Sequence, residues 1–377
     1  MIIKELSAKK IKDSRGEPTI EVSVNNCKAS SPSGKSKGKY ETPSFHISLN
    51  WNINAINSFQ EIKVLNIFSF ADLHLVEDLI KIRFKLKNVK QFGANALYAL
   101  ESAILKALAK EKNKELWQII NEKAKRFPIP LGNAVGGGLH SHNKNAPIFQ
   151  EFLLASQGYS FKENYKIMKS VYSKIKNRLK TKAINDEGAW QTSLSESQIL
   201  EVLSKFRKIR IGIDIAASSF YGKSKYHYKF KSLTRKEQID NINQLIKKYN
   251  LLYVEDPLEE NDFQGFSKIK KKNLVCGDDL TVTHIDRLKK AIKEKSINAL
   301  IIKPNQNGSL LELHEIFKIC KRNRIKTILS HRSGETLDTG LADYAFGFGA
   351  DYIKCGIATP WRGAKLNRLL EIEKSLK

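Results

Sequence analysis

The clearest pattern in the chain is a series of short apolar runs in its second half, each closed by a polar or charged residue. The runs are IGID, LLYVE, LVCGD, ALIIK, TILSH and DYIK, which end at Asp214, Glu255, Asp278, Lys303, His331 and Lys354. From Glu255 onward the run ends lie about 25 residues apart, which leaves room for one strand, one helix and two loops. Between the runs, apolar residues three and four positions apart predict amphipathic helices, as in 284–295 and 309–323.

This alternation predicts a parallel sheet covered by helices, since near-continuous apolar strands are typical of sheets buried on both faces. Over the roughly 250 residues from 127 to 377, a closed (β/α)8 barrel is the simplest arrangement. In such barrels the chemistry lies at the carboxyl ends of the strands and in the loops that follow them. We therefore expect the polar residues at the run ends to line one active site.

The first 126 residues follow a different pattern, which predicts a smaller α+β cap domain. Alternation up to about position 25 predicts strands joined by a turn at Asp13–Thr19. A Gly/Ser/Lys-rich loop follows at Ser31–Tyr40, then mixed helical material over 50–90 and a pair of packed helices from Phe92 onward. Pro128 and Pro130 interrupt the pattern, so we place the boundary between domains 1–126 and 127–377.

The chain is strongly basic, with 65 Lys and Arg against 39 Asp and Glu and a formal net charge of +26. Such an excess is typical of proteins that bind nucleic acid or anionic membranes. Lysines supply 52 of these cations and arginines only 13, however, and arginine is the residue favoured for bidentate contacts to phosphates and guanine edges. We interpret the charge mainly as a compositional bias spread over a solvated surface. Attraction of an anionic partner or an acidic substrate is the alternative.

Cysteine usage and hydropathy indicate where the protein works. The four cysteines are far apart and form no CxxC pair, which predicts reduced thiols in the cytoplasm. Cys276 and Cys355 lie in apolar runs and are expected to be core residues. No apolar run is close to the length of about 18 residues that a membrane-spanning helix needs, so we expect a soluble protein.

Three of the run ends, Asp214, Glu255 and Asp278, are carboxylates that a barrel would bring together. Like charges at close range repel. A hard divalent cation removes that repulsion, and a ligand set of oxygens alone suits Mg²⁺ better than zinc. Each carboxylate taken alone is explained as well by capping the following helix, but three in the same position favour a metal site.

Later run ends are cationic. Lys303 and Lys354 close apolar strands, and a lysine near a metal and a second cation has a lowered pKa and can act as a general base. Pairing with the acidic cluster is the alternative for both lysines. Between them, Arg332 and Ser333 of SHRSGET could clamp a phosphate or an oxyanion, with a loop salt bridge as the alternative.

Further candidates lie upstream. Glu187 occupies the turn NDEGAW, and we place Gln150 and Glu151 of QEF near the first barrel strand. The Gly-rich segment GGGLHSH carries His140 and His142. An HxH pair can bind a metal, but the carboxylates explain the metal better, and we interpret His142 as an ordinary loop residue.

Taken in order, these segments resemble the motifs of the enolase (phosphopyruvate hydratase) family from one end of the chain to the other. The matching motifs are DSRGEPT, SPSGKSKG, GANA, GGGLH, QEF, NDEG, IGIDIAASSFY, VEDP, GDDLTVT, IIKPNQNGS, SHRSGET and IKCG. The resemblance implies an enolase-type (β/α)8 barrel preceded by an N-terminal cap domain. It implies a cytoplasmic lyase of glycolysis that converts 2-phosphoglycerate reversibly to phosphoenolpyruvate, as a homodimer or higher oligomer.

The same resemblance implies two Mg²⁺ ions per active site. Asp214, Glu255 and Asp278 match the ligands of a first, tightly held ion. Ser36, in the Gly/Ser/Lys-rich loop, matches a ligand of a second ion that arrives with the substrate. Two such ions would stabilise the negative charge that develops when a proton is removed next to a carboxylate.

The other candidates match catalytic and substrate-binding positions of the family. Lys303 resembles the base that takes the proton from C2, and Glu187 resembles the acid that helps the C3 hydroxyl leave, supported by Glu151. The substrate-binding matches are His140, which closes over the substrate, Gln150 and Lys354 at its carboxylate and metals, and Arg332 and Ser333 at its phosphate.

The chain also departs from the family pattern. Lys35 and Lys37 replace small or neutral loop residues, Asn185 replaces a glycine before the acid, and Pro304 follows the base. The segment between Tyr40 and Phe92 is compressed. These changes raise the question whether loop closure and the turn around Glu187 keep their usual form.

Two alternatives remain open. Another acid dehydratase or racemase of the same superfamily would be expected to lack the phosphate and second-metal residues Ser36, His140, Arg332 and Ser333, all of which are present. A basic-surface protein that binds nucleic acid, membrane or a host protein, including at the cell surface, is the other. That role could coexist with catalysis, and binding that falls steeply with salt would support it.

Overall fold

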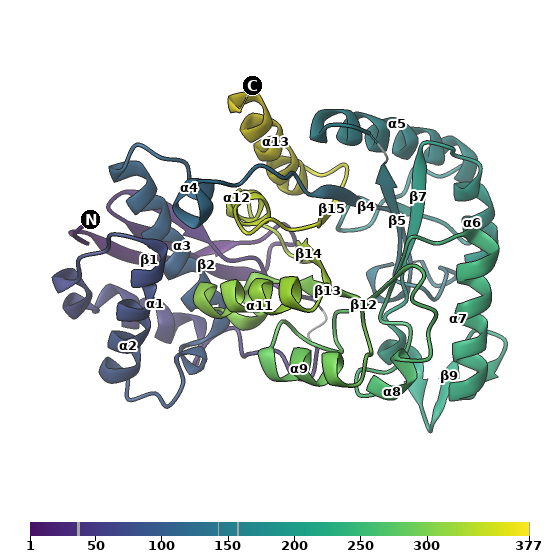
Figure 1. The fold of residues 1–377 in the computed structure, drawn as a ribbon, viewed down its shortest axis with the longest axis horizontal. Helices are drawn as coiled ribbons and strands as arrows, with labels where there is room; N and C mark the ends of the chain where they lie inside the picture. The colour runs from purple at the N-terminus through teal and green to yellow at the C-terminus, as the bar shows by residue number, and fades with distance from the viewer. Residues whose placement is uncertain (36–37, 142, 157, 377) are drawn as a thin grey trace.

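The computed structural model describes residues 1–35, 38–141, 143–156 and 158–376. Figure 1 shows two parts, a small N-terminal sheet with its helices in purple and blue, and a barrel coloured teal to yellow. Their apolar side chains form one continuous buried cluster that runs from Met1 in the first part to Ile372 in the last helix. The predicted combination of a cap domain and a barrel is therefore confirmed, whereas the boundary at 126/127 stays a prediction.

The N-terminal part is an antiparallel sheet covered by helices. Strand β1 pairs with β2, and β2 with β3. Its strands are β1 (Leu6–Lys12), β2 (Pro18–Val24) and β3 (Cys27–Ser30), and its helices are α1 (Leu49–Asn57), α2 (Leu73–Arg83), α3 (Ala94–Glu111) and α4 (Leu116–Asn121). Short 3₁₀ turns at Gln60–Val64, Phe70–Asp72 and Val89–Phe92 complete the mixed helical region. The nearly fully buried α3 packs on β2, β3 and α4, as the predicted helix pair requires.

Eight strands close the barrel. Neighbours pair in the order β15, β14, β13, β12, β11, β7, β5, β4, and β15 pairs again with β4. They are β4 (Ile129–Gly136), β5 (Glu151–Ser156), β7 (Ile209–Asp214), β11 (Tyr253–Glu255), β12 (Leu274–Gly277), β13 (Ala299–Ile302), β14 (Lys326–Ser330) and β15 (Tyr352–Gly356). Side chains from these strands, among them Leu131, Leu153 and Ile301, fill the barrel with a second apolar cluster.

One strand differs from the predicted parallel arrangement. β5 runs antiparallel to both β4 and β7, because the described residues between β4 and β5 contain one short 3₁₀ turn and no crossover helix. The first residue of β5, Glu151, therefore lies at the catalytic end of the barrel, opposite Asp214. Gln150 and Glu151 lie near the first barrel strand, as predicted: Glu151 begins the second strand, β5, and pairs with Gly136 at the end of β4.

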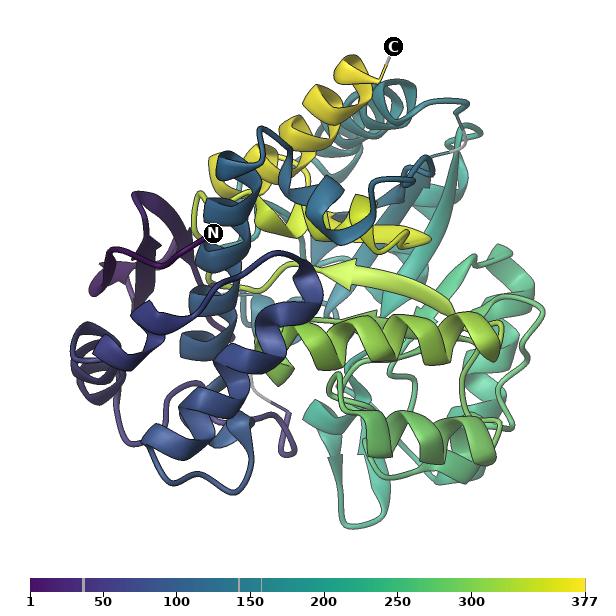
Figure 2. The ribbon, with the colours of Figure 1, turned by 60° about the vertical axis from the view of Figure 1, so that its left-hand side comes forward.

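Helices cover the outside of the barrel, and in Figure 2 the last of them, α13, lies beside α5. They are α5 (Phe161–Leu179), α6 (Glu196–Ser204), α7 (Arg235–Tyr249), α8 (Phe263–Phe266), α9 (Ile285–Lys293), α10 (Pro304–Asn307), α11 (Leu310–Arg322), α12 (Gly340–Gly347) and α13 (Pro360–Ser375). Small strands add to the loops: β6 (Trp190–Gln191) beside β4, and β8 (Tyr221–Gly222), β9 (Lys225–His227) and β10 (Ser232–Leu233) as a separate sheet. Cys276 and Cys355 are buried core residues, as predicted. None of the helices in the described ranges combines the length and apolar composition needed to span a bilayer.

Candidate active site

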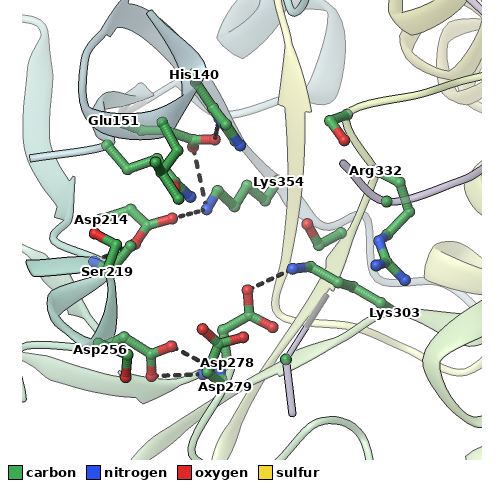
Figure 3. A pocket seen from close by; sticks show the side chains of 18 of the residues that line it. His140, Glu151, Asp214, Ser219, Asp256, Asp278, Asp279, Lys303, Arg332 and Lys354 are labelled. Carbon is green, nitrogen blue, oxygen red and sulfur yellow. Dashed lines mark hydrogen bonds and ion pairs between the residues drawn. The ribbon is translucent and has the colours of Figure 1, made fainter. Parts of the chain in front are cut away.

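The predicted residues meet in a pocket of about 320 Å³ at the catalytic end of the barrel (Figure 3). Of the predicted residues that the structure describes, only Glu255 is absent from the lining. Glu255 is fully buried and is bound to Lys354, which does line the pocket. Ser36 lies outside the described residues. The predicted residues that line the pocket are His140, Gln150, Glu151, Glu187, Asp214, Asp278, Lys303, Arg332, Ser333 and Lys354.

Lys354 links three buried carboxylates. Its Nζ lies 2.9 Å from Asp214 Oδ2, 2.8 Å from Glu255 Oε2 and 3.1 Å from Glu151 Oε2. Lys354 is the third residue of β15 rather than its last, so it reaches the strand-end carboxylates from inside the barrel and not from a loop. Burial lowers the pKa of Lys354, but the carboxylates outweigh burial and raise it well above 10.5, so the group stays an ammonium.

Lys303 pairs with Asp278 across neighbouring strand ends. The two residues directly follow β13 and β12, and Lys303 Nζ donates a hydrogen bond to Asp278 Oδ2. Burial lowers the pKa of Lys303, but Asp278 outweighs burial and raises the pKa to about 12. Burial raises the pKa of Asp278, and Lys303 and Lys354 together bring it below its ordinary value. Lys303 is therefore protonated while it is paired with Asp278. Its raised pKa is the opposite of the lowered pKa that we expected for a general base.

Glu187 is held by a turn that Asn185 builds. The side-chain Oδ1 of Asn185 accepts hydrogen bonds from the backbone N–H groups of Glu187 at 3.0 Å and Ala189 at 2.9 Å, the bonding pattern of an Asx turn. Asn133 Nδ2 donates to Glu187 Oε2 at 3.0 Å. The departure at position 185 therefore fixes the turn around Glu187.

Glu187 and Glu151 have opposite pKa shifts. Burial raises the pKa of Glu187, but His140, His331 and Arg362 bring it well below 4.5. Burial raises the pKa of Glu151 against the opposing effect of Lys354. His140 Nδ1 lies 3.5 Å from Glu151 Oε1 and 3.7 Å from Glu187 Oε1. Of the two carboxyls, Glu151 therefore binds a proton more readily than Glu187.

Arg332 is held by residues far away in the sequence. Its Nη1 donates to Asn305 Oδ1 at 3.1 Å, and its Nη2 lies 2.9 and 3.1 Å from the two carboxylate oxygens of Glu41. A Cβ on Gly34 would lie 2.1 Å from Nη2, so a larger residue at this position would displace the guanidinium from its present place. Ser333 Oγ accepts a hydrogen bond at 2.7 Å from the backbone N–H of Lys35, which ties the same loop to the barrel.

Oxygen ligands of the kind that Mg²⁺ prefers are present. Asp214, Glu255 and Asp278 end or follow the adjacent strands β7, β11 and β12. The buried Oε1 of Glu255 has no hydrogen-bond partner among the described residues, as expected of an atom reserved for a ligand. The donor chemistry therefore fits a hard divalent cation.

The carboxylates that lie close enough to share an ion are grouped differently from our prediction. In the part of the chain that the structure describes, groups with ligand atoms within 4.8 Å of one another are His140 with Glu151 and Glu187, and Asp256 with Asp278 and Asp279. Lys354 lies between Asp214 and Glu255, and its ammonium provides their positive charge.

Sequence reasoning missed three acidic residues of this site. Asp256 accepts hydrogen bonds from the backbone N–H groups of Asp278 and Asp279 at 2.9 and 2.6 Å. Burial and Asp278 raise the pKa of Asp279 to about 7. Asp256 follows the predicted ligand Glu255 in VEDP, and Asp279 follows the predicted ligand Asp278 in GDDLTVT. Their positions in these motifs were the signal that could have identified them. Glu41 carried no signal, because its partner Arg332 belongs to the other domain.

Comparison with known proteins agrees with this geometry. The family model described as "Enolase, N-terminal domain" matches residues 3–120, and the one described as "Enolase, C-terminal TIM barrel domain" matches residues 124–377. Proteins named Enolase from Archaeoglobus fulgidus and Thermoplasma acidophilum are each 35% identical, over 99% of this chain and 98% of theirs. The Enolase of Natronomonas pharaonis is 34% identical over 99% of both chains. With both domain models matched in order and relatives similar over the full length, the chain belongs to the enolase family and is an enzyme of the phosphopyruvate hydratase class.

Proposed function

We propose that the chain carries out the reversible dehydration of 2-phosphoglycerate to phosphoenolpyruvate with Mg²⁺, and that the pocket residues perform it in the roles given below. The observation that carries the proposal is a single pocket with Lys303 at one side and, at the other, the carboxyls of Glu151 and Glu187, which lie 3.5 and 3.7 Å from His140 Nδ1. Figure 3 shows Lys303 and Glu151 on either side of Lys354. A base and an acid facing one substrate from opposite sides are what an anti elimination of water requires.

The cations of the pocket match the charges of this substrate. Its phosphate would meet Arg332, whose planar guanidinium suits bidentate contacts to phosphate, together with Ser333. Its carboxylate would meet Lys354, with Gln150 beside it in the pocket lining. Binding at Arg332 must compete with Glu41, which pairs with the same Nη2 atom.

Lys303 would remove the proton at C2. This step needs the neutral amine, and Asp278 is the group that raises the pKa of Lys303 to about 12 against the effect of burial. Bound at Asp214, Glu255 and Asp278, Mg²⁺ would offset that carboxylate charge and stabilise the negative charge that develops on the substrate carboxylate.

The pair of Glu151 and Glu187 would deliver a proton to the departing C3 hydroxyl. The pKa of Glu151 is raised and that of Glu187 is lowered, so Glu151 is the member of the pair that takes up a proton first. His140, close to both carboxyls, would complete the pocket wall on that side. Ser36 as a ligand of a second Mg²⁺, the homodimer, the cytoplasmic location and the place in glycolysis stay predictions drawn from the family resemblance.

The test is a direct assay of the purified chain with 2-phosphoglycerate and Mg²⁺, following the absorbance of phosphoenolpyruvate. We expect turnover that EDTA abolishes. Lys303→Ala should lower kcat by a factor on the order of 10²–10⁴, the usual contribution of a general base. Lys289→Ala, at an exposed position of α9, is the matched control and should leave kcat unchanged. Absence of turnover, or equal rates for Lys303→Ala and wild type, would contradict the proposal, and turnover of a different hydroxy acid would support the other superfamily activity.

A further inference from the structure

Arg362 is a buried arginine close to the pocket but outside its lining. It belongs to the first turn of α13, its side chain has no exposed surface, and it is absent from the residues that line the pocket. A guanidinium is costly to bury unless paired and hydrogen-bonded. Its position therefore calls for an explanation in terms of what it contacts.

The contacts of Arg362 are concentrated on three consecutive residues of the pocket wall. Nη2 donates to the backbone carbonyl oxygens of Ser333 at 2.7 Å and Arg332 at 3.2 Å. Nε donates to His331 Nδ1 at 3.4 Å. The remaining nitrogen, Nη1, donates to Ser14 Oγ at 3.4 Å. One guanidinium thus holds the backbone of the two residues proposed to bind phosphate and the ring of the histidine before them.

Ion pairing does not account for this burial. Arg362 has no salt-bridge partner among the described residues, whereas Arg368, farther along the same helix, pairs with Asp343 and Glu115. Its hydrogen-bond acceptors in the described ranges, His331 Nδ1, Ser14 Oγ and two backbone carbonyls, are neutral. Without a carboxylate partner, the buried guanidinium contributes less to the stability of the fold than a paired one would. Residues kept at such a cost are typical of functional sites.

The contact with His331 determines where that ring carries its proton. A guanidinium has donors and no acceptor, so His331 Nδ1 must present its lone pair to Arg362. The neutral ring then carries its hydrogen on Nε2, which lies 3.8 Å from Glu187 Oε2. A second proton, on Nδ1, would clash with the hydrogen that Arg362 Nε donates to that atom.

We propose that Arg362 is a positioning residue for the reaction: it orders the 331–333 wall of the pocket and fixes His331 as the neutral tautomer that points its Nε2–H at Glu187. The kinetic part of this inference rests on the proposed function, whereas the tautomer does not. The charged groups that act on the His331 ring are Glu187, Arg362, Lys354 and Lys303, from four different segments. Burial is the largest influence on the pKa of His331, and with the three cations it outweighs Glu187 and lowers the pKa from 6.5 to about 3.

The first test is ¹⁵N NMR of histidine-labelled protein, with the His331 signals assigned through His331→Gln. Wild type should show one neutral tautomer with the proton on Nε2 throughout the range from about pH 5.5 to 8.5, which spans the ordinary histidine pKa. In Arg362→Met the ring should populate both tautomers or become protonated within that range. A wild-type ring with its proton on Nδ1, or one that titrates near pH 6.5, would overturn the proposal even if Arg362→Met failed to fold.

The second test is kinetic and uses Arg368→Met as the matched control, because it removes a partly buried arginine from the same helix, one that pairs with Asp343 and Glu115 rather than with residues 331–333. Arg362→Met should lower kcat by about tenfold or more, a typical loss when a supporting residue of a site is removed, and its kcat profile should gain an acid limb near the histidine pKa. That acid limb should vanish in the double variant Arg362→Met/His331→Gln. Arg362→Lys should recover little of the lost kcat, since a single ammonium cannot reproduce the planar set of guanidinium donors. If Arg362→Met and Arg368→Met lost kcat equally and both kept the wild-type pH profile, Arg362 would have a structural role only. A wild-type chain without turnover would contradict the proposed function, and the NMR result would still decide on the tautomer.

Discussion

At the scale of single residues, Lys354 is the centre of charge balance in the barrel. Its ammonium contacts Asp214, Glu255 and Glu151, all of them buried. Removing one partner of a buried ion pair leaves an uncompensated charge and costs on the order of 3–5 kcal/mol. Lys354 therefore contributes to the stability of the barrel as well as to the chemistry proposed for it, and a loss of activity on its substitution has to be separated from a loss of folded protein.

Glu101 on α3 offers a test of buried charge away from the pocket. Its Oε2 accepts a hydrogen bond at 2.7 Å from the backbone N–H of Leu310 at the start of α11, and its Oε1 has no hydrogen-bond partner among the described residues. Burial, followed by the charge of Glu77, raises the pKa of Glu101 well above 4.5. The folded chain thus keeps a proton that the unfolded chain releases.

The sign of the resulting pH dependence follows from linkage. The folded state binds more protons above pH 4.5, so this group's contribution is fully present below that pH and is lost as the pH rises toward the raised pKa. Glu101→Gln keeps the shape but cannot ionise. We expect its Tm relative to wild type to increase between about pH 5 and about pH 8, in thermal melts of both proteins. Glu122→Gln, at an exposed position, should show no such trend, and a Glu101→Gln difference that is constant or falls with pH would contradict this account.

Sequence patterns could predict which residues line the pocket but not which residues hold them. Run ends and motifs identified Arg332, Lys303 and Asp278 because strand ends of a barrel converge. The carboxylate that pairs with Arg332, Glu41, and the guanidinium that supports it, Arg362, come from a loop of the other domain and from the last helix. Such partners depend on how the domains and the last helix pack, which no local spacing encodes.

At the scale of elements, the direction of β5 shows the same limit. Glu151–Ser156 is an apolar run buried at every position, and a run of this kind has no preferred direction. The direction is set by the connection from β4, in whose described residues there is no crossover helix. The regular spacing of strands begins only at β11, because α5 and α6 both lie between β5 and β7, and the small strands β8, β9 and β10 lie with α7 between β7 and β11. The later strands and helices could accordingly be predicted from their regular spacing, whereas the arrangement of the first two strands, β4 and β5, could not.

At the scale of the whole molecule, the net charge of +26 is far larger than the pocket needs. Like charges over a folded surface repel and destabilise the compact state. Added salt screens this repulsion, since the Debye length falls from about 30 Å at 0.01 M to about 10 Å at 0.1 M. We therefore expect the Tm of the chain to rise over this range of NaCl concentration. Sucrose at matched osmolality is the control for effects other than screening, and a Tm that falls or stays constant with salt would contradict a repulsive surface.

The central claim, that Lys303 removes the C2 proton while the pair of Glu151 and Glu187 assists departure of the C3 hydroxyl, is tested most directly by NMR of 2-phosphoglycerate in D₂O with Mg²⁺. The wild-type chain should exchange the C2 hydrogen and form phosphoenolpyruvate. Glu187→Gln should still exchange C2 while losing most product formation, and Lys303→Ala should lose both. Exchange at C2 that persists at the wild-type rate in Lys303→Ala would contradict the account.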